Sequence, residues 1–265
     1  MVEGLLFNAA LLAAVMLALW LVAVRIDDVS FVDAVWGGAM ALLAFASWWR
    51  LEAPGALAHL IAAMTVAWGA RLAIHLLRRW RREGEDQRYA RMLRKDRERG
   101  TFAQAALVKV FLGQALLLFL VSSPAQVGIF ASEAPAPIGP LALAGLALYL
   151  VGIAFEWIGD WQLARFRADP ANEGSVLDSG LWRYTRHPNY FGDACAWWGI
   201  WLACASAGWG YALWTVAGPL FLTFTLTRWS GAALLEAGMR KKRDDAYADY
   251  VARTPAFVPW FPRRG

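Results

Sequence analysis

The sequence contains only two cysteines and three histidines among 265 residues, and this scarcity excludes several kinds of site. Cys195 and Cys204 lie in one apolar run, so they are too few for a disulfide framework and belong to no metal-ligand spacing. The histidines, His59, His75 and His187, are scattered along the chain, which argues against a zinc or di-iron centre. We therefore predict no metal site.

The chain also lacks the motifs of several other classes of protein. It has no Gly-rich phosphate loop, so any nucleotide would be held by side chains and helix ends. It shows no internal repeat, so an inverted-repeat transporter gains no support. The net charge of +5 is modest and concentrated in one set of loops, which indicates membrane topology and no nucleic-acid partner.

Long apolar runs, by contrast, are abundant. The chain is 59% hydrophobic and contains 16 tryptophans, which is more apolar sequence than a soluble domain needs. Seven stretches approach the roughly 20 residues of a spanning helix: 4–24, 31–50, 56–77, 103–123, 139–163, 189–207 and 210–230. The predicted fold class is all-α, an integral membrane bundle of seven transmembrane helices plus a C-terminal amphipathic helix at 234–252.

The loops between these runs alternate in charge. Residues 78–100 contain ten lysines or arginines, and 165–187 and the tail after Arg228 are also basic. The loops at 51–55 and 124–138 contain none, and we interpret the Pro-rich second one as a plain outer connector. The positive-inside rule then places the N-terminus outside and the C-terminus in the cytoplasm, which requires an odd number of spans.

Several ionisable residues fall inside or at the ends of these spans, where each costs roughly 2.5–3.5 kcal/mol. Asp33 near the start of the second span is either a first-turn acid or an acid facing a cavity. Arg71 lies deep in the third span. Glu156 and Asp160, spaced i, i+4 in the fifth, mark either a solvated helix end or a polar ligand site. Asp193 lies one turn inside the sixth span and has no such simple explanation.

The stretch before Asp193 has the features of a binding site. Pro188 can begin a helix at the membrane surface, where its exposed N–H groups favour an anion. Asn189 shares a helix face with Asp193, and Arg186 and His187 add positive charge at the rim. These polar residues gather at the cytoplasmic ends of several spans, so we predict a charged pocket there for a large, polar, anionic ligand.

The chain resembles the membrane-embedded steroid 5-alpha-reductase family, in its bacterial DUF1295 branch. The resemblance is carried by "SFVDAVWG" at 30–37, "GEDQRY" at 84–89, a long match at 155–193 and the "PWFP" tail. It implies one seven-helix membrane domain over 1–265, with a family core at about 139–265. It also implies bound NADPH and reduction of a carbon–carbon double bond conjugated to a ketone, in a 3-oxo-Δ4 steroid or another lipid enone.

The resemblance further implies which residues bind NADPH. Carried over by position, they are Arg71, Arg88, Glu156, Asp160, Arg167, Tyr184, His187, Asn189, Tyr190, Asp193, Trp197, Glu236 and Arg240. We add Arg186 to these cofactor-binding candidates because of its positive charge at the rim.

Two further residues are candidates for catalysis. In the family an acid on the second helix and a Tyr on the third engage the substrate carbonyl. Asp33 stands at the acid position, but Trp68 stands where the Tyr is expected. A protonated Asp33 would then stabilise the enolate oxygen, with Tyr89 or a water molecule in place of the missing Tyr.

The expected substrate is a lipophilic molecule that enters from the bilayer, and the Ala-, Leu- and Arg-rich composition favours the inner membrane of a bacterium. The main alternative is a membrane methyltransferase of the isoprenylcysteine type that uses S-adenosylmethionine and shares the Arg-His-Pro-x-Tyr feature. The continuation through Asn189 and Asp193 favours the reductase. A transporter or a non-catalytic scaffold is the remaining class.

Overall fold

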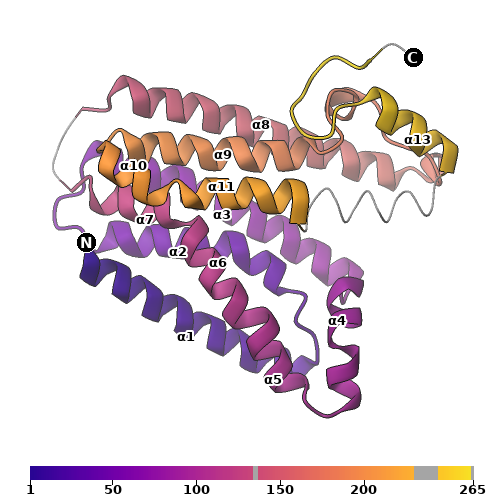
Figure 1. Ribbon diagram of the computed structural model, residues 1–265, viewed down its shortest axis with the longest axis horizontal. Coiled ribbons are helices and arrows are strands. Elements are labelled where there is room, and N and C mark those ends of the chain that lie inside the picture. The colour runs from indigo at the N-terminus through magenta and orange to yellow at the C-terminus, as the bar shows by residue number, and fades with distance from the viewer. Residues whose placement is uncertain (134–136, 230–243, 264–265) are drawn as a thin grey trace. The chain divides into compact units, whose positions relative to one another are not determined.

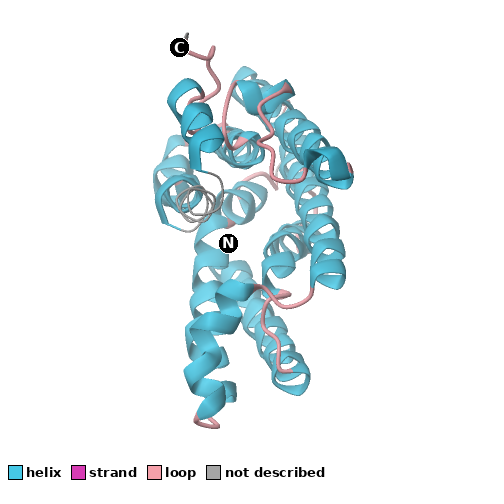
Figure 2. Ribbon diagram, turned by 90° about the vertical axis from the view of Figure 1, so that its right-hand side faces the viewer, coloured by secondary structure: helices cyan, strands magenta, loops and turns pink. Residues whose placement is uncertain are grey.

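The computed structural model describes residues 1–133, 137–229 and 244–263, and every regular element in those ranges is a helix (Figures 1 and 2). This confirms the all-α prediction. Within the described ranges, five helical segments are long and apolar enough to cross a membrane: α1 (Val2–Ile26), α2 (Val32–Trp49), α3 (Ala56–Glu83), Phe102–Val121 and α8 (Pro140–Ala168). The protein therefore has the character of a multi-pass membrane protein.

The last two predicted spans differ from these five. The sixth is helical, since α9 covers Pro188–Ala205, but it does not reach the same apolarity. The seventh predicted span, 210–230, is helical over its described residues but is interrupted at Val216: the chain there forms α10 (Trp209–Thr215), α11 (Ala217–Phe224) and a π-helix, η4 (Thr225–Trp229). Pro219 has no N–H to donate to the carbonyl of Thr215, which explains why α10 ends there.

The Pro-rich segment at 124–138 is not the plain connector that we predicted. Its first part belongs to α7 (Ser123–Phe130), whose residues 124–129 are all buried. Pro124 lies in the first turn, where a proline starts a helix instead of breaking it. The helix α7 contacts α2, α3 and α10 most extensively and also contacts α1 and α6, so this short helix is part of the core.

The basic segment at 78–100 is also helical. The third span continues to Glu83, the chain turns at Gly84 with φ of 73°, and α4 then covers Gln87–Glu98. The Asp86 side chain caps α4 by accepting a hydrogen bond from the N–H of Arg88 at 2.8 Å. Arg, Lys, Glu and Gln all favour helix, but hydropathy alone does not reveal a helix of this composition.

The described helices divide between two compact units, the first of which comprises residues 1–143 and 200–218. Its closest pair is α2 and α3. They cross at Gly37 and Gly69, where a Cβ atom on Gly37 would lie 2.5 Å from the carbonyl oxygen of Gly69. The amide of Asn8 on α1 donates to Ser47 at 2.7 Å and to Gln126 on α7 at 2.9 Å, so a buried polar contact joins three helices.

The fourth apolar segment of this unit is not a regular α-helix throughout. It begins as α5 (Phe102–Ala106), widens into a π-helix, η1 (Leu107–Leu112), and ends as α6 (Gly113–Val121). A π-helix inside an apolar helix is uncommon and frequently accompanies a functional site.

The second unit comprises residues 144–199 and 219–265. In it α8 and α9 lie side by side and meet through glycines (Figure 1). A Cβ atom on Gly192 would lie 2.5 Å from the carbonyl oxygen of Gly152, and one on Gly199 would lie 2.5 Å from that of Gly145. Because the glycines are seven residues apart on each helix, the two backbones stay in contact over two turns.

The predicted C-terminal amphipathic helix is described only in part. Residues Asp244–Arg253 form α13. The rest of that predicted helix, 234–243, lies outside the described residues.

Candidate functional site

The first candidate site lies where α2 begins, in the first unit. The turn before this helix is organised by Asp28, whose carboxylate accepts from the N–H of Ser30 at 2.7 Å and from the indole N–H of Trp80 at 2.8 Å. Such side-chain-to-backbone bonds are typical of Asp in a turn. The turn places Asp33 in the first helical turn, which is one of the two alternatives that the sequence left open, with its side chain 23% exposed.

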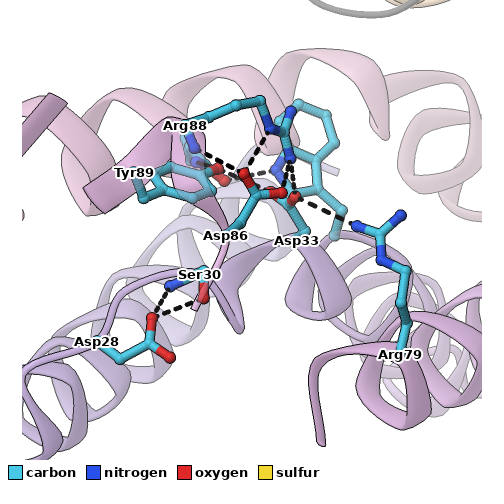
Figure 3. A network of polar contacts seen from close by, with 9 residues as sticks. Asp28, Ser30, Asp33, Arg79, Asp86, Arg88 and Tyr89 are labelled. Atoms are coloured by element: carbon cyan, nitrogen blue, oxygen red, sulfur yellow. Dashed lines mark hydrogen bonds and ion pairs between the residues drawn. The ribbon is translucent and has the colours of Figure 1, made fainter. Parts of the chain in front are cut away.

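Asp33 accepts hydrogen bonds at both carboxylate oxygens (Figure 3). The Tyr89 hydroxyl donates to Oδ1 at 2.7 Å, and the Arg88 guanidinium donates to Oδ2 at 2.7 Å. A second guanidinium, that of Arg79 on α3, lies 4.0 Å from Oδ2. Both oxygens of this carboxylate are therefore acceptors, and one of the donors is a cation.

A chain of hydrogen bonds extends from Tyr89 to two residues that our sequence reasoning missed. Gln114 on α6 donates its amide N–H to the Tyr89 oxygen at 3.0 Å, and the indole N–H of Trp36 donates to the Gln114 carbonyl oxygen at 2.6 Å. An indole can only donate, so it fixes which end of the Gln114 amide faces Tyr89. The Tyr89 oxygen is therefore an acceptor toward Gln114, and its proton points to Asp33.

The sequence does contain a signal for Gln114. It is the single amide in the otherwise apolar run "VFLGQALLLFLV" at 110–121. An amide in such a run needs a buried partner.

The groups around α4 have shifted pKa values. The pKa of Tyr89 is raised, first by burial and then by the charge of Asp33 and the hydrogen bond to it. The pKa of Asp86 is lowered: burial acts to raise it, but hydrogen bonds from the Arg88 side chain and backbone and the Arg88 charge outweigh that effect. Arg88 thus bridges Asp86 and Asp33, which draws the start of α4 toward the start of α2.

We expect the Tyr89 hydroxyl to stay protonated at pH values at which an ordinary tyrosine, with a pKa of about 10, ionises. A raised folded pKa means that the stability due to this group is fully present below pH 10 and is lost as the pH rises further. An alkaline titration followed by tyrosinate absorbance measures this. Between pH 9 and 11 the Tyr89→Phe protein should show the same absorbance change as the unsubstituted protein. If the absorbance change of Tyr89→Phe were smaller by the amount that one tyrosine contributes, Tyr89 would ionise in this range and the prediction would be wrong.

The second unit holds most of the predicted cofactor residues, and the structure brings several of them together. Asn189, at the start of α9, donates to the carboxylate of Asp160 on α8 at 3.2 Å. The rings of His187 and Tyr190 stack with centroids 5.5 Å apart. Glu156 is completely buried, and the backbone of α9 passes close to it at Gly192. The predicted grouping at the α8 end and the α9 start is thus present.

Other residues of the predicted set lie around this group. Trp197 is completely buried in α9, Asp193 is half-buried, and Arg167 is exposed near the end of α8. Arg186 donates from its guanidinium to the backbone carbonyls of Val251 and Thr254, at 3.0 and 2.7 Å. These two bonds give Arg186 a structural task that the sequence did not suggest.

The structure describes only some of the remaining predicted residues. Arg71 and Trp68 lie on α3 in the first unit, the former half-buried and the latter buried. Glu236 and Arg240 lie outside the described residues. No group of His, Cys, Asp or Glu suited to a metal ion occurs in the part of the chain that the structure describes.

Comparison with known proteins gives one match. A family model with the description "Protein of unknown function (DUF1295)" matches residues 19–254. The match includes α2, α4 and α9, and so both groups of polar residues described above. No match is found among curated proteins or among solved structures.

Proposed function

The chain belongs to the DUF1295 family, and we propose that it is an NADPH-dependent membrane reductase of a carbon–carbon double bond conjugated to a ketone. The observation that carries this proposal is the contact between Asp33 and Tyr89. They come from the two short matching stretches, 30–37 and 84–89, and form the acid and phenol pair that such a reduction needs. The substrate would be a lipid enone or a 3-oxo-Δ4 steroid that enters from the bilayer.

The reaction adds a hydride to the β-carbon of the enone, and negative charge then develops on the ketone oxygen as the C=C electrons move toward it. The resulting enolate takes a proton from water at its α-carbon, which completes the reduction. NADPH, when bound, supplies the hydride. A hydrogen-bond donor aimed at that oxygen stabilises the charge, and Tyr89 is suited to this task because it is neutral and held at its oxygen by Gln114.

Asp33 takes a different role from the one that the sequence suggested. Its two oxygens accept hydrogen bonds in this structure, so it is not arranged as a proton donor. We assign it the positioning of Tyr89 and of Arg88. The ketone oxygen of the substrate would replace Asp33 as the acceptor of the Tyr89 hydrogen bond, while Gln114 continues to donate to the phenol oxygen.

The residues at the start of α9 fit a dinucleotide. A helix of 18 residues presents N–H groups at its first turn, and Arg165 and Arg167 at the end of α8 are exposed and add positive charge. Asp160 and Asn189 supply an acceptor and an amide that hydrogen-bond sugar hydroxyls or an amide. NADPH would be held by this group, with the protein in a bacterial inner membrane and its C-terminus in the cytoplasm.

Thermal unfolding tests the cofactor directly. NADPH at about 100 times its dissociation constant should stabilise the detergent-solubilised protein by about 2.7 kcal/mol. That corresponds to a rise in Tm of several degrees, while S-adenosylmethionine should leave Tm unchanged. A rise with S-adenosylmethionine alone would overturn the reductase proposal and support the methyltransferase. NADPH oxidation by the protein should then be measured with enone steroids, prenyl enones and fatty enones. If none of them is reduced, the proposed reaction is wrong.

A further inference from the structure

We propose that the C-terminal strap, residues 255–263, is an interfacial anchor that inserts aromatic side chains into the lipid headgroup region. Three large apolar side chains of the strap are exposed: Val258 at 63%, Trp260 at 71% and Phe261 at 71%. Single exposed hydrophobic residues are ordinary, but three within four positions form a patch. Such a patch marks contact with another surface.

The strap is held in place by its backbone. The Arg186 N–H donates to the carbonyl of Pro255 at 3.0 Å, and the Trp260 N–H donates to the carbonyl of Tyr184 at 2.9 Å. The ring of Phe261 meets that of Tyr184 edge to face, with centroids 6.0 Å apart. These contacts fix the path of the strap backbone, so its exposed side chains are held at one place on the second unit.

The strap is connected, through the turn at 180–184, to the part of α8 where a spanning segment of about 20 residues would end. The turn that precedes Tyr184 is bonded to α8: the Trp182 indole donates to the carbonyl of Gly159 at 3.1 Å, and the Leu181 N–H donates to the Gln162 side chain at 3.0 Å. A span of about 20 residues counted from the start of α8 ends at the same place. The end of such a span and the residues of α8 that bind the turn therefore lie within a few residues of each other along α8.

The lipid-facing side of α8 carries an aromatic belt at this level. Trp157 and Trp161 are one turn apart and are 57% and 58% exposed. The guanidinium of Arg165 lies 5.6 Å from the centre of the Trp161 ring. Trp and Tyr side chains concentrate at membrane–water interfaces, where the ring is apolar and its edge is hydrated. The strap adds Trp260 to this belt.

The charges beside the patch favour lipid over a protein as its partner. Two arginines of the turn and the strap that the proposed cofactor group does not use are exposed: Arg183 and Arg263. Aromatic side chains next to basic ones are the composition of segments that lie on anionic membranes.

Site-specific fluorescence tests the anchor in the full-length protein. Trp260→Cys and Phe261→Cys are each labelled with the environment-sensitive dye NBD and placed in phosphatidylcholine–phosphatidylglycerol vesicles. The native Cys195 and Cys204 are buried, and the unsubstituted protein measures any background labelling. We expect both labels to lie at the boundary between the headgroups and the acyl chains, to a depth of about 5–10 Å. A nitroxide near the headgroup end of the acyl chain should then quench them more than one near the terminal methyl, and aqueous iodide should quench them weakly.

Glu173→Cys is the matched control, because Glu173 is exposed in a loop of the same unit. Its label should be quenched by iodide and not by either nitroxide. Two results would overturn the anchor. The first is iodide quenching at the strap equal to that at the control. The second is strap labels that neither iodide nor the lipid nitroxides quench, because protein would then cover the patch. None of these measurements depends on the proposed enzymatic function.

Discussion

The Tyr89→Phe protein is expected to reduce an enone substrate about 10²- to 10³-fold more slowly than the unsubstituted protein, which is the usual loss when one hydrogen-bond donor to a developing oxyanion is removed. The substitution removes only the phenol oxygen, which in the structure lies between Asp33 and Gln114. Because the ring stays, the fold should be retained. NADPH oxidation in the presence of the enone measures the loss as a fall in kcat.

Three comparisons separate this loss from a general disturbance. Tyr211→Phe makes the same chemical change in α10 and should leave turnover unchanged. The rise in Tm caused by NADPH should survive in Tyr89→Phe, because Tyr89 is not among the residues proposed to hold the dinucleotide. Asp33→Asn should also slow turnover, since a neutral amide pairs poorly with Arg88 and no longer fixes the direction of the Tyr89 proton. Full activity of Tyr89→Phe would exclude Tyr89 as the donor.

The second large effect concerns the meeting of α8 and α9. In Gly192→Ala the added Cβ atom would lie 2.5 Å from the carbonyl oxygen of Gly152 and 2.8 Å from the side chain of Glu156. The backbones of α8 and α9 must separate to make room for this atom. We therefore expect the free energy of unfolding to fall by at least the roughly 1–3 kcal/mol that overpacking usually costs. The Tm of the detergent-solubilised protein and its elution as a single species report this cost.

Gly113→Ala is the matched control for this substitution. Gly113 begins α6 in a right-handed helical conformation, and a Cβ atom there would meet nothing within 4 Å. Replacing a glycine in a helix by alanine under these conditions stabilises by roughly 0.5–1 kcal/mol. The same chemical change should therefore lower Tm at Gly192 and raise it at Gly113. An equal response at the two positions would contradict the close approach of α8 and α9.

The length of the apolar runs correctly predicted the first five long helices. The helix at 87–98 and the burial of 124–129 were not predicted, for two different reasons. The helical part of 78–100 escaped detection because its ten basic residues hide it from hydropathy. The burial of 124–129 escaped because prolines suggest loops, although Pro124 starts a helix here. Both errors arise because burial and helix formation depend on tertiary neighbours as well as on composition.

The sequence identified two residues of the candidate site but not the contacts between its residues. Asp33 and Tyr89 were both named from the sequence, yet they are 56 positions apart and nothing in their motifs shows that they touch. Gln114 and Trp36 were missed because an amide and an indole in apolar runs have no spacing rule. Their roles follow only from the direction of each hydrogen bond.

The π-helix η1 has a consequence for how the chain tolerates changes in length. A π turn holds one residue more than an α turn, so deleting one residue within Leu107–Leu112 would leave a continuous α-helix. Ala103, which accepts the Trp20 indole, and Gln114 would then keep their partners. A deletion a few residues earlier, in α5, would instead rotate one part of the helix against the other by about 100°. Relatives that differ by one residue in this span should therefore differ at η1.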